Sequence, residues 1–171
     1  NLLFLGLLLI TLLVQLFMPA FVSLIAPGFV GDIDKMEIAI TLTRITFPFL
    51  LFICLASFFS AILNSHNKFA AAAAAPIILN IVLILVLIFS KSLGDQLVYY
   101  LSYGVSLAGF LQLIFLYRYV SKYYSLNFSL KLKVSNKVKF FFLNLLPSIF
   151  ASEVTQINIL IGTITVSFQA S

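Results

Sequence analysis

The sequence contains few charged residues, one cysteine and one histidine. Charged side chains make up 9% of its 171 residues, against about 25% in an ordinary soluble domain. The single cysteine, Cys54, excludes an internal disulfide and a cysteine-based metal cluster. The histidine, His66, has no partner at metal-ligand spacing, and the sequence has neither a glycine-rich phosphate loop nor a Ser/His/Asp set. Because these catalytic and metal-binding motifs are absent, the sequence gives no support to an enzyme. We expect no cofactor and no metal.

Apolar residues dominate the rest of the chain. They make up 63% of it, and the mean hydropathy is +1.18, a balance that requires lipid as the solvent. A bilayer core about 30 Å thick needs roughly 20 apolar residues per helix. Five runs meet this length, at residues 2–25, 38–63, 69–89, 97–120 and 138–168. We therefore expect an all-α, polytopic transmembrane helical bundle, and because the chain starts without Met and stops within an apolar run, we expect it to be an internal fragment.

The distribution of basic residues predicts the orientation in the membrane. Six of the ten Lys and Arg residues lie between Arg118 and Lys139, with no acidic residue among them. Lys68 falls in a loop on the same predicted side, whereas only Lys35 and Lys91 fall in loops on the other side. Because basic residues accumulate in cytoplasmic loops, the start of the chain and loop 121–137 are predicted to be cytoplasmic. The net charge of +5 is thus attributed to contact with membrane lipids, and no nucleic-acid partner is expected.

Tyrosines mark the two ends of the fourth run. All seven lie either between Tyr99 and Tyr103 or between Tyr117 and Tyr124. At 1.5 Å per residue, Tyr100 and Tyr119 are about 28 Å apart along a helix. This separation matches the two aromatic belts at the membrane surfaces, so residues 97–120 are predicted to span the membrane once.

Two features inside the runs bear on function. Proline stands within four of the predicted helices, at Pro19, Pro48, Pro76 and Pro147, where it removes a backbone donor and can bend the helix. The fifth run also places polar or small residues on one helical face, namely Asn144, Ser148, Ser152, Thr155, Gln156, Gly162 and Thr163. Such a face lines a water-filled cavity or packs against other helices, and the sequence leaves both possibilities open.

Several short motifs resemble the MurJ/MviN family of lipid II flippases. They are Ala-Pro-Gly-Phe at 26–29, Leu-Thr-Arg-Ile-Thr-Phe-Pro-Phe at 42–49, Ala-Ile-Leu-Asn at 61–64, Phe69, Ala75-Pro76, Leu79-Asn80, Leu146-Pro147 and Gln156-Ile157. The motifs occur in the same order as in the family over nearly the whole chain. This ordered set identifies the family more specifically than any single motif does.

The resemblance implies a fold of the multidrug/oligosaccharidyl-lipid/polysaccharide exporter type, with about fourteen helices in two lobes around a central cavity. Residues 1–121 would belong to the first lobe, 122–137 would form a basic cytoplasmic linker, and 138–171 would form a long kinked helix that begins the second lobe. The implied activity is transport of lipid II across the bacterial inner membrane. Two alternatives remain: an exporter of another polyprenyl-linked sugar or drug, and a membrane scaffold that does not transport.

The resemblance also suggests which residues take part. Gln156 and Asn80 are the best candidates for lining the substrate cavity, and Asn144 and Ser148 join them because they share the polar face of the fifth run. Pro147 is the candidate hinge between the lobes. The arginines that the family uses to hold the diphosphate come chiefly from helices outside this chain, so no such role is assigned here.

Overall fold

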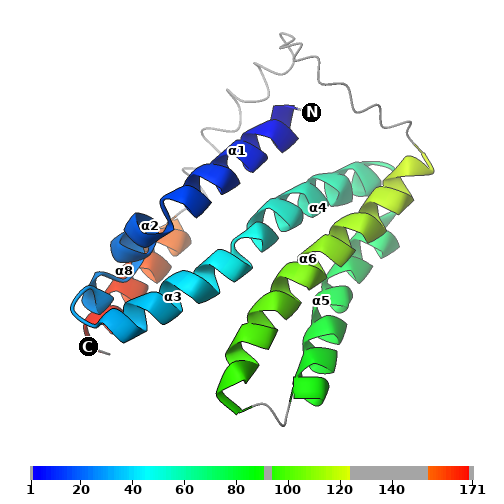
Figure 1. The fold of residues 1–171 in the computed structure, drawn as a ribbon. Coiled ribbons are helices and arrows are strands. Elements are labelled where there is room, and N and C mark those ends of the chain that lie inside the picture. Colours follow the sequence, from blue (N-terminus) through cyan, green and yellow to red (C-terminus); the bar gives the residue numbers. More distant parts are fainter. Residues whose placement is uncertain (1, 91–93, 124–153, 170–171) are drawn as a thin grey trace. The chain divides into compact units, whose positions relative to one another are not determined.

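A computed structural model describes residues 2–90, 94–123 and 154–169 of the chain. The described elements are helical (Figure 1) and comprise α1 (Leu2–Leu16), α2 (Met18–Ile25), η1 (Pro27–Phe29), α3 (Ile33–Thr46), α4 (Pro48–Ser65), α5 (Phe69–Ser90), η2 (Gly94–Gln96), α6 (Leu97–Ser121) and α8 (Val154–Gln169). No β-strand occurs within these residues. The predicted helical membrane fold is therefore confirmed.

Three helical stretches of the described chain are long and apolar enough to cross a membrane, at Ile33–Ser65, Phe69–Ser90 and Leu97–Ser121. The pair formed by α1 and α2 would add a fourth if it acts as one broken span. The linker at 122–137 and the first half of the fifth run lie almost entirely outside the described residues.

The structure differs from the predicted runs at two prolines. The first run is broken at Phe17, two residues before Pro19, and the second is interrupted at Phe47, directly before Pro48. A proline has no N–H for the helical bond, and its ring crowds the preceding turn, so a new helix begins at or next to each of them. Pro76 lies inside α5, which continues through it.

The helices form two compact units, and each has its own packing. One unit contains Leu2–Met18 and Ile40–Phe128, and the other contains Pro19–Ala39 and Ser129–Ser171. In the first unit α6 packs along both α4 and α5, and α1 contacts α4. Its core consists of apolar side chains from α4, α5 and α6, namely Ala56, Phe59, Leu63, Ala71, Ala75, Leu116 and Val120.

Small residues on α6 allow its neighbours to come close. A Cβ at Gly104 would lie 2.9 Å from Cγ2 of Val86 on α5, and a Cβ at Gly109 would lie 2.6 Å from Cδ2 of Phe49 on α4. Ala108, between them, is completely buried. The close packing at Gly104 and Ala108 follows the pattern of membrane helices that associate through small side chains.

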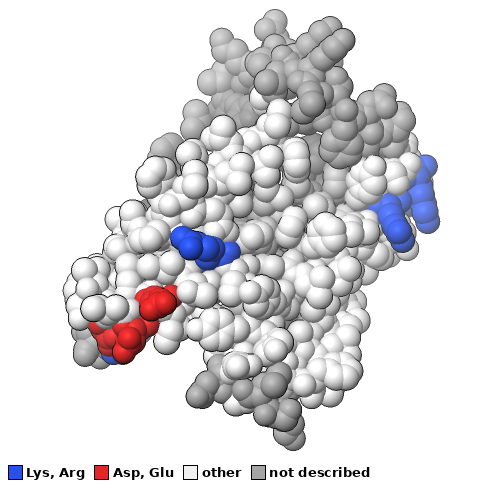
Figure 2. Space-filling view, viewed as in Figure 1, with Lys and Arg blue, Asp and Glu red and all other residues white. Residues whose placement is uncertain are grey.

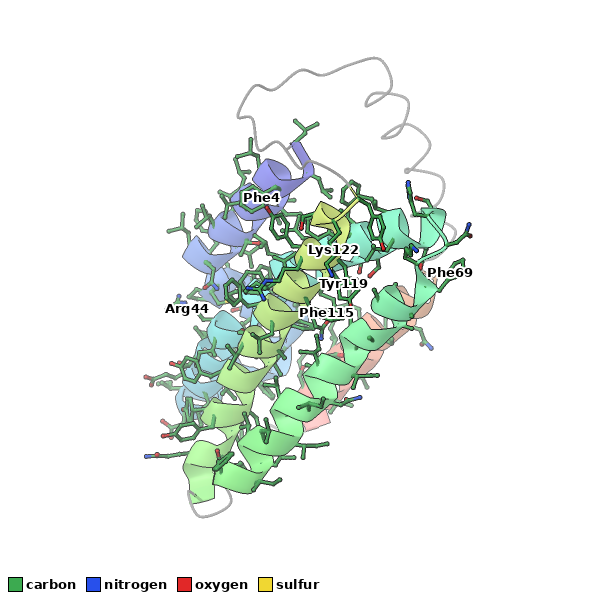
Figure 3. The ribbon with its side chains drawn as sticks, turned by 90° about the vertical axis from the view of Figure 1, so that its right-hand side faces the viewer. Phe4, Arg44, Phe69, Phe115, Tyr119 and Lys122 are labelled. Atoms are coloured by element: carbon green, nitrogen blue, oxygen red, sulfur yellow. The ribbon has the colours of Figure 1, made fainter. Side chains whose placement is uncertain are left out.

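Aromatic and basic side chains gather at the C-terminal end of α6. The rings of Phe115 and Tyr119 have centroids 4.9 Å apart, and the Lys122 ammonium lies 4.9 Å from the Tyr119 centroid, so the three form a column along the helix (Figure 3). Lys68, from the turn between α4 and α5, lies 5.4 Å from the Tyr123 ring. This second cation–π contact connects that turn to the end of α6.

Gly109→Leu should destabilise the first unit, because the new side chain has no room against Phe49 and Phe52. Overpacking of this kind costs about 1–3 kcal/mol, so the thermal midpoint of the purified full-length protein in detergent should fall. Gly6→Leu is the matched control, since nothing lies within 4 Å of the position a Cβ would take there. Equal midpoints for the two variants would contradict the proposed helix contact.

Candidate functional site

The turn at residues 26–29 is the most sharply defined feature of the second unit. Pro27 opens a short 3-10 helix, for which its fixed backbone angle is suited. The Phe29 N–H donates to the Ala26 carbonyl over 3.1 Å, and the Val30 N–H donates to the Pro27 carbonyl over 3.2 Å. These two bonds within the turn fix its shape where it connects α2 to α3.

Helix α8 lies directly against this turn. The Gly28 N–H donates to the Ser167 hydroxyl oxygen over 3.2 Å, and that hydroxyl in turn donates to the Ile164 carbonyl over 2.7 Å. A Cβ at Gly28 would collide with the backbone of Ser167. Only glycine allows this approach, and it leaves Ser167 buried, with 3% of its surface exposed.

A cavity of about 400 Å³ opens beside this contact. It is lined almost entirely by apolar atoms of Ala26, Phe29, Gly162, Thr163, Val166 and Ser167. The Thr163 hydroxyl donates to the Ile159 carbonyl of its own helix over 3.0 Å. The polar groups at the cavity are thus already bonded within α8, and the cavity suits an apolar group better than a charged one.

Acidic residues gather at the start of α3 in the same unit, and Figure 2 shows acidic side chains in one patch. Asp32 accepts a hydrogen bond from the Lys35 N–H over 3.1 Å and forms an ion pair with the Lys35 ammonium at 3.1 Å. The backbone hydrogen bond is the main cause of a pKa of Asp32 below its ordinary value. Among the residues that the structure describes, no group of three His, Cys, Asp or Glu side chains could hold a metal.

The structure places only some of the predicted site residues. Asn80 lies on α5 with its side chain exposed. Gln156 lies in α8, but its side chain is outside what the structure describes, as are Asn144, Pro147 and Ser148 altogether. Their assignment to a substrate cavity remains a prediction.

Part of the predicted polar face does have a described environment. Gly162 and Thr163 both line the cavity next to the turn at residues 26–29, and both residues are exposed. Sequence reasoning missed Ser167, which lies one helical turn beyond Thr163. Extending the four-residue spacing of the polar face would have found it.

The chain matches the family model of lipid II flippase MurJ over residues 1–171. It is 39% identical over 171 residues to the probable lipid II flippase MurJ of Rickettsia prowazekii, covering 98% of this chain and 33% of that protein. It is also 39% identical over 165 residues to the protein of the same name from Rhizobium tropici, covering 94% of this chain and 31% of that one. The chain thus spans about a third of the length of these relatives.

Gly28→Ala should separate the turn at residues 26–29 from α8, because the added methyl group collides with the Ser167 backbone. The separation can be measured in the full-length protein with Cys54→Ser, by oxidative cross-linking of a Phe29→Cys and Val166→Cys pair, two positions that line the same cavity. We expect a lower cross-linking yield. Gly31→Ala is the control, since nothing lies near the position its Cβ would take. An unchanged yield with Gly28→Ala would contradict the contact.

Proposed function

The chain belongs to the MurJ family of lipid II flippases, and on this premise we propose that the full-length protein carries lipid II from the inner to the outer leaflet of the bacterial inner membrane. The observation that carries the proposal is the family match over the whole chain. The protein would act as a transporter and not as an enzyme. Its substrate partner would be the lipid-linked peptidoglycan precursor, and this chain would supply part of the path.

The arrangement of the described helices supports this proposal. Long apolar helices that bury few polar groups fit a bilayer, and two of the three long spans contain a proline, at Pro48 and Pro76. Interrupted helices are common in transporters whose lobes rock around a central site. We infer alternating access, with the substrate cavity open to one side of the membrane at a time.

Lipid II exposure in cells distinguishes the proposal from its alternatives. The full-length protein would be expressed in bacteria depleted of their own flippase, and an externally added toxin that cleaves lipid II would report how much lipid II reaches the outer face. Restored cleavage supports the flippase. Correct membrane insertion without cleavage would instead favour another exported polyprenyl-linked sugar or drug, or a scaffold.

The cavity candidates predict a graded loss of this activity. Gln156→Leu and Asn144→Leu should each lower lipid II exposure by about tenfold, the effect of losing one hydrogen bond to a charged or polar substrate. Asn158→Leu is the control, since it removes an exposed amide side chain of α8 that is not among the predicted cavity residues. The proposal extends to Asn80 and Ser148, whose apolar variants should behave like Gln156→Leu. Equal effects of the Asn144 and Asn158 variants would remove the cavity assignment.

Pro147 is proposed as the hinge between the lobes. Pro147→Ala would straighten the helix and should weaken complementation of a flippase-depleted strain while leaving membrane insertion intact. Full complementation would eliminate the hinge.

We also propose the sidedness that the basic residues indicate, with residue 1 and loop 121–137 in the cytoplasm. In a Cys54→Ser chain, Gly31→Cys should react with a membrane-impermeant maleimide in intact cells. His66→Cys, in the turn after α4, should react only after the cells are permeabilised. The reverse pattern would invert the proposed orientation.

A further inference from the structure

The interruption between α3 and α4, here called the Pro48 break, leaves backbone carbonyls without helical donors. In a regular helix the N–H of residue 48 would bond to the carbonyl of Arg44, but proline has no N–H. After the break, the Leu50 N–H donates to the Phe47 carbonyl over 3.0 Å, three residues back and not four. Within a bilayer an unsatisfied carbonyl costs several kcal/mol, so partners from elsewhere are required.

Two neighbouring helices supply those partners. The Gln15 side-chain amide of α1 donates to the Arg44 carbonyl over 2.8 Å, and the Ser106 hydroxyl of α6 donates to the Ile45 carbonyl over 2.5 Å. All these residues belong to one compact unit.

Other side chains of the described helices show a different pattern. The Thr11 hydroxyl donates to the Leu7 carbonyl and the Ser102 hydroxyl donates to the Val98 carbonyl, in each case four residues back in the same helix. Gln15 and Ser106 instead reach across to a different helix and meet at adjacent carbonyls. This convergence on the Pro48 break indicates a specific role.

Arg44 itself is an unusual residue for this position. It is the single charged residue between Glu37 and Lys68, its side chain is exposed, and it lies beside α1 (Figure 3). Among the described residues no carboxylate forms an ion pair with it, in contrast to Lys35 and Asp32 at the start of α3. A charge within an apolar span is costly, and such residues mark sites where an opposite charge binds.

The hydrogen bonds from Gln15 and Ser106 determine what the Arg44 guanidinium can bind. Free carbonyls at the C-terminal end of α3 would be the natural acceptors for a nearby guanidinium. Because α1 and α6 already satisfy these carbonyls, the five guanidinium donors remain available to an acceptor from outside the unit. Their planar geometry fits carboxylate and phosphate groups, and phosphate is the one that membrane lipids carry in their headgroups.

We propose that Gln15, which replaces the donor that Pro48 lacks, and Ser106, which bonds the next carbonyl at the break, are positioning residues that present Arg44 to the phosphate of a membrane lipid. The shared chemistry is a lipid-borne phosphate, either the diphosphate of lipid II or the headgroup of an anionic phospholipid. The choice of lipid II rests on the proposed function, whereas the role of Gln15 and Ser106 does not.

A double-mutant cycle tests the positioning role in the full-length protein. Pro48→Ala restores the backbone N–H, so the Arg44 carbonyl regains its helical donor. Gln15→Leu should therefore lower the thermal midpoint in the native chain and have little effect in the Pro48→Ala chain. Ser106→Ala should behave in the same way, because a helix that continues through residue 48 also brings the Phe49 N–H to the Ile45 carbonyl. Ser102→Ala, one turn earlier on α6, should not depend on residue 48. If Pro48→Ala does not insert, Pro48→Ser supplies the same N–H. An equal fall of the thermal midpoint on Gln15→Leu in the native chain and in the Pro48→Ala chain would overturn the positioning role.

Lipid binding tests the role of Arg44. The protein would be held in nanodiscs of zwitterionic lipid, and lipid II and phosphatidylglycerol would be titrated separately. Arg44→Gln should weaken binding of one of them by about tenfold or more, the effect of losing charge-assisted hydrogen bonds, and Arg44→Lys should retain part of it. Gln15→Leu should weaken binding of the same lipid in the native chain and should leave it unchanged in the Pro48→Ala chain. General destabilisation would not produce this dependence on residue 48.

Lys35→Gln is the matched control, because it removes a cation from the same helix that already has a carboxylate partner. If Arg44→Gln weakens binding of phosphatidylglycerol alone, Arg44 belongs to a phospholipid site. The proposed transport of lipid II is then judged by the exposure assay in cells. Unchanged binding of both lipids by Arg44→Gln, or equal losses with Lys35→Gln, would overturn the phosphate site.

Discussion

Backbone N–H and C=O groups inside a bilayer find no water, so each must be satisfied within the protein. The described part of this chain meets that constraint with helices, and the places where proline interrupts a helix are the places where other elements must contribute. At Pro48 the freed carbonyls accept bonds from Gln15 and Ser106 on two other helices. The backbone N–H that is missing at Pro48 thus leads to hydrogen bonds that join this break to α1 and α6.

Close approach of backbones is the second condition on which the packing depends. Lipid tails are as apolar as the helix surfaces, so helices gain little from the hydrophobic effect and associate through tight fit. Gly104 and Gly109 let α6 reach α5 and α4 in one unit, and Gly28 lets the turn at residues 26–29 reach α8 in the other. In each case the missing side chain creates the room that the neighbour occupies.

Sequence reasoning was most successful for the helices that are uniform along their length. Helices α5 and α6 lie within a residue of the apolar runs at 69–89 and 97–120, since a hydrophobic run long enough to cross a bilayer has few other stable conformations. It was less successful at Pro19 and Pro48. A membrane helix can continue through a proline, as α5 does at Pro76, or can be interrupted by one, as at Pro48, where two neighbouring helices supply donors.

The sequence by itself determined the environment and the class of this protein, because 63% apolar residues arranged in long runs can be solvated only by lipid, and because its ordered motifs match one family. The tertiary structure alone decided which residues cooperate. Gln15, Ser106 and Arg44 are far apart in the chain and share no motif, and Ser167 lies 139 residues from Gly28. Hydrogen bonds between such residues depend on where folded helices meet, which local propensity and hydrophobic periodicity do not specify.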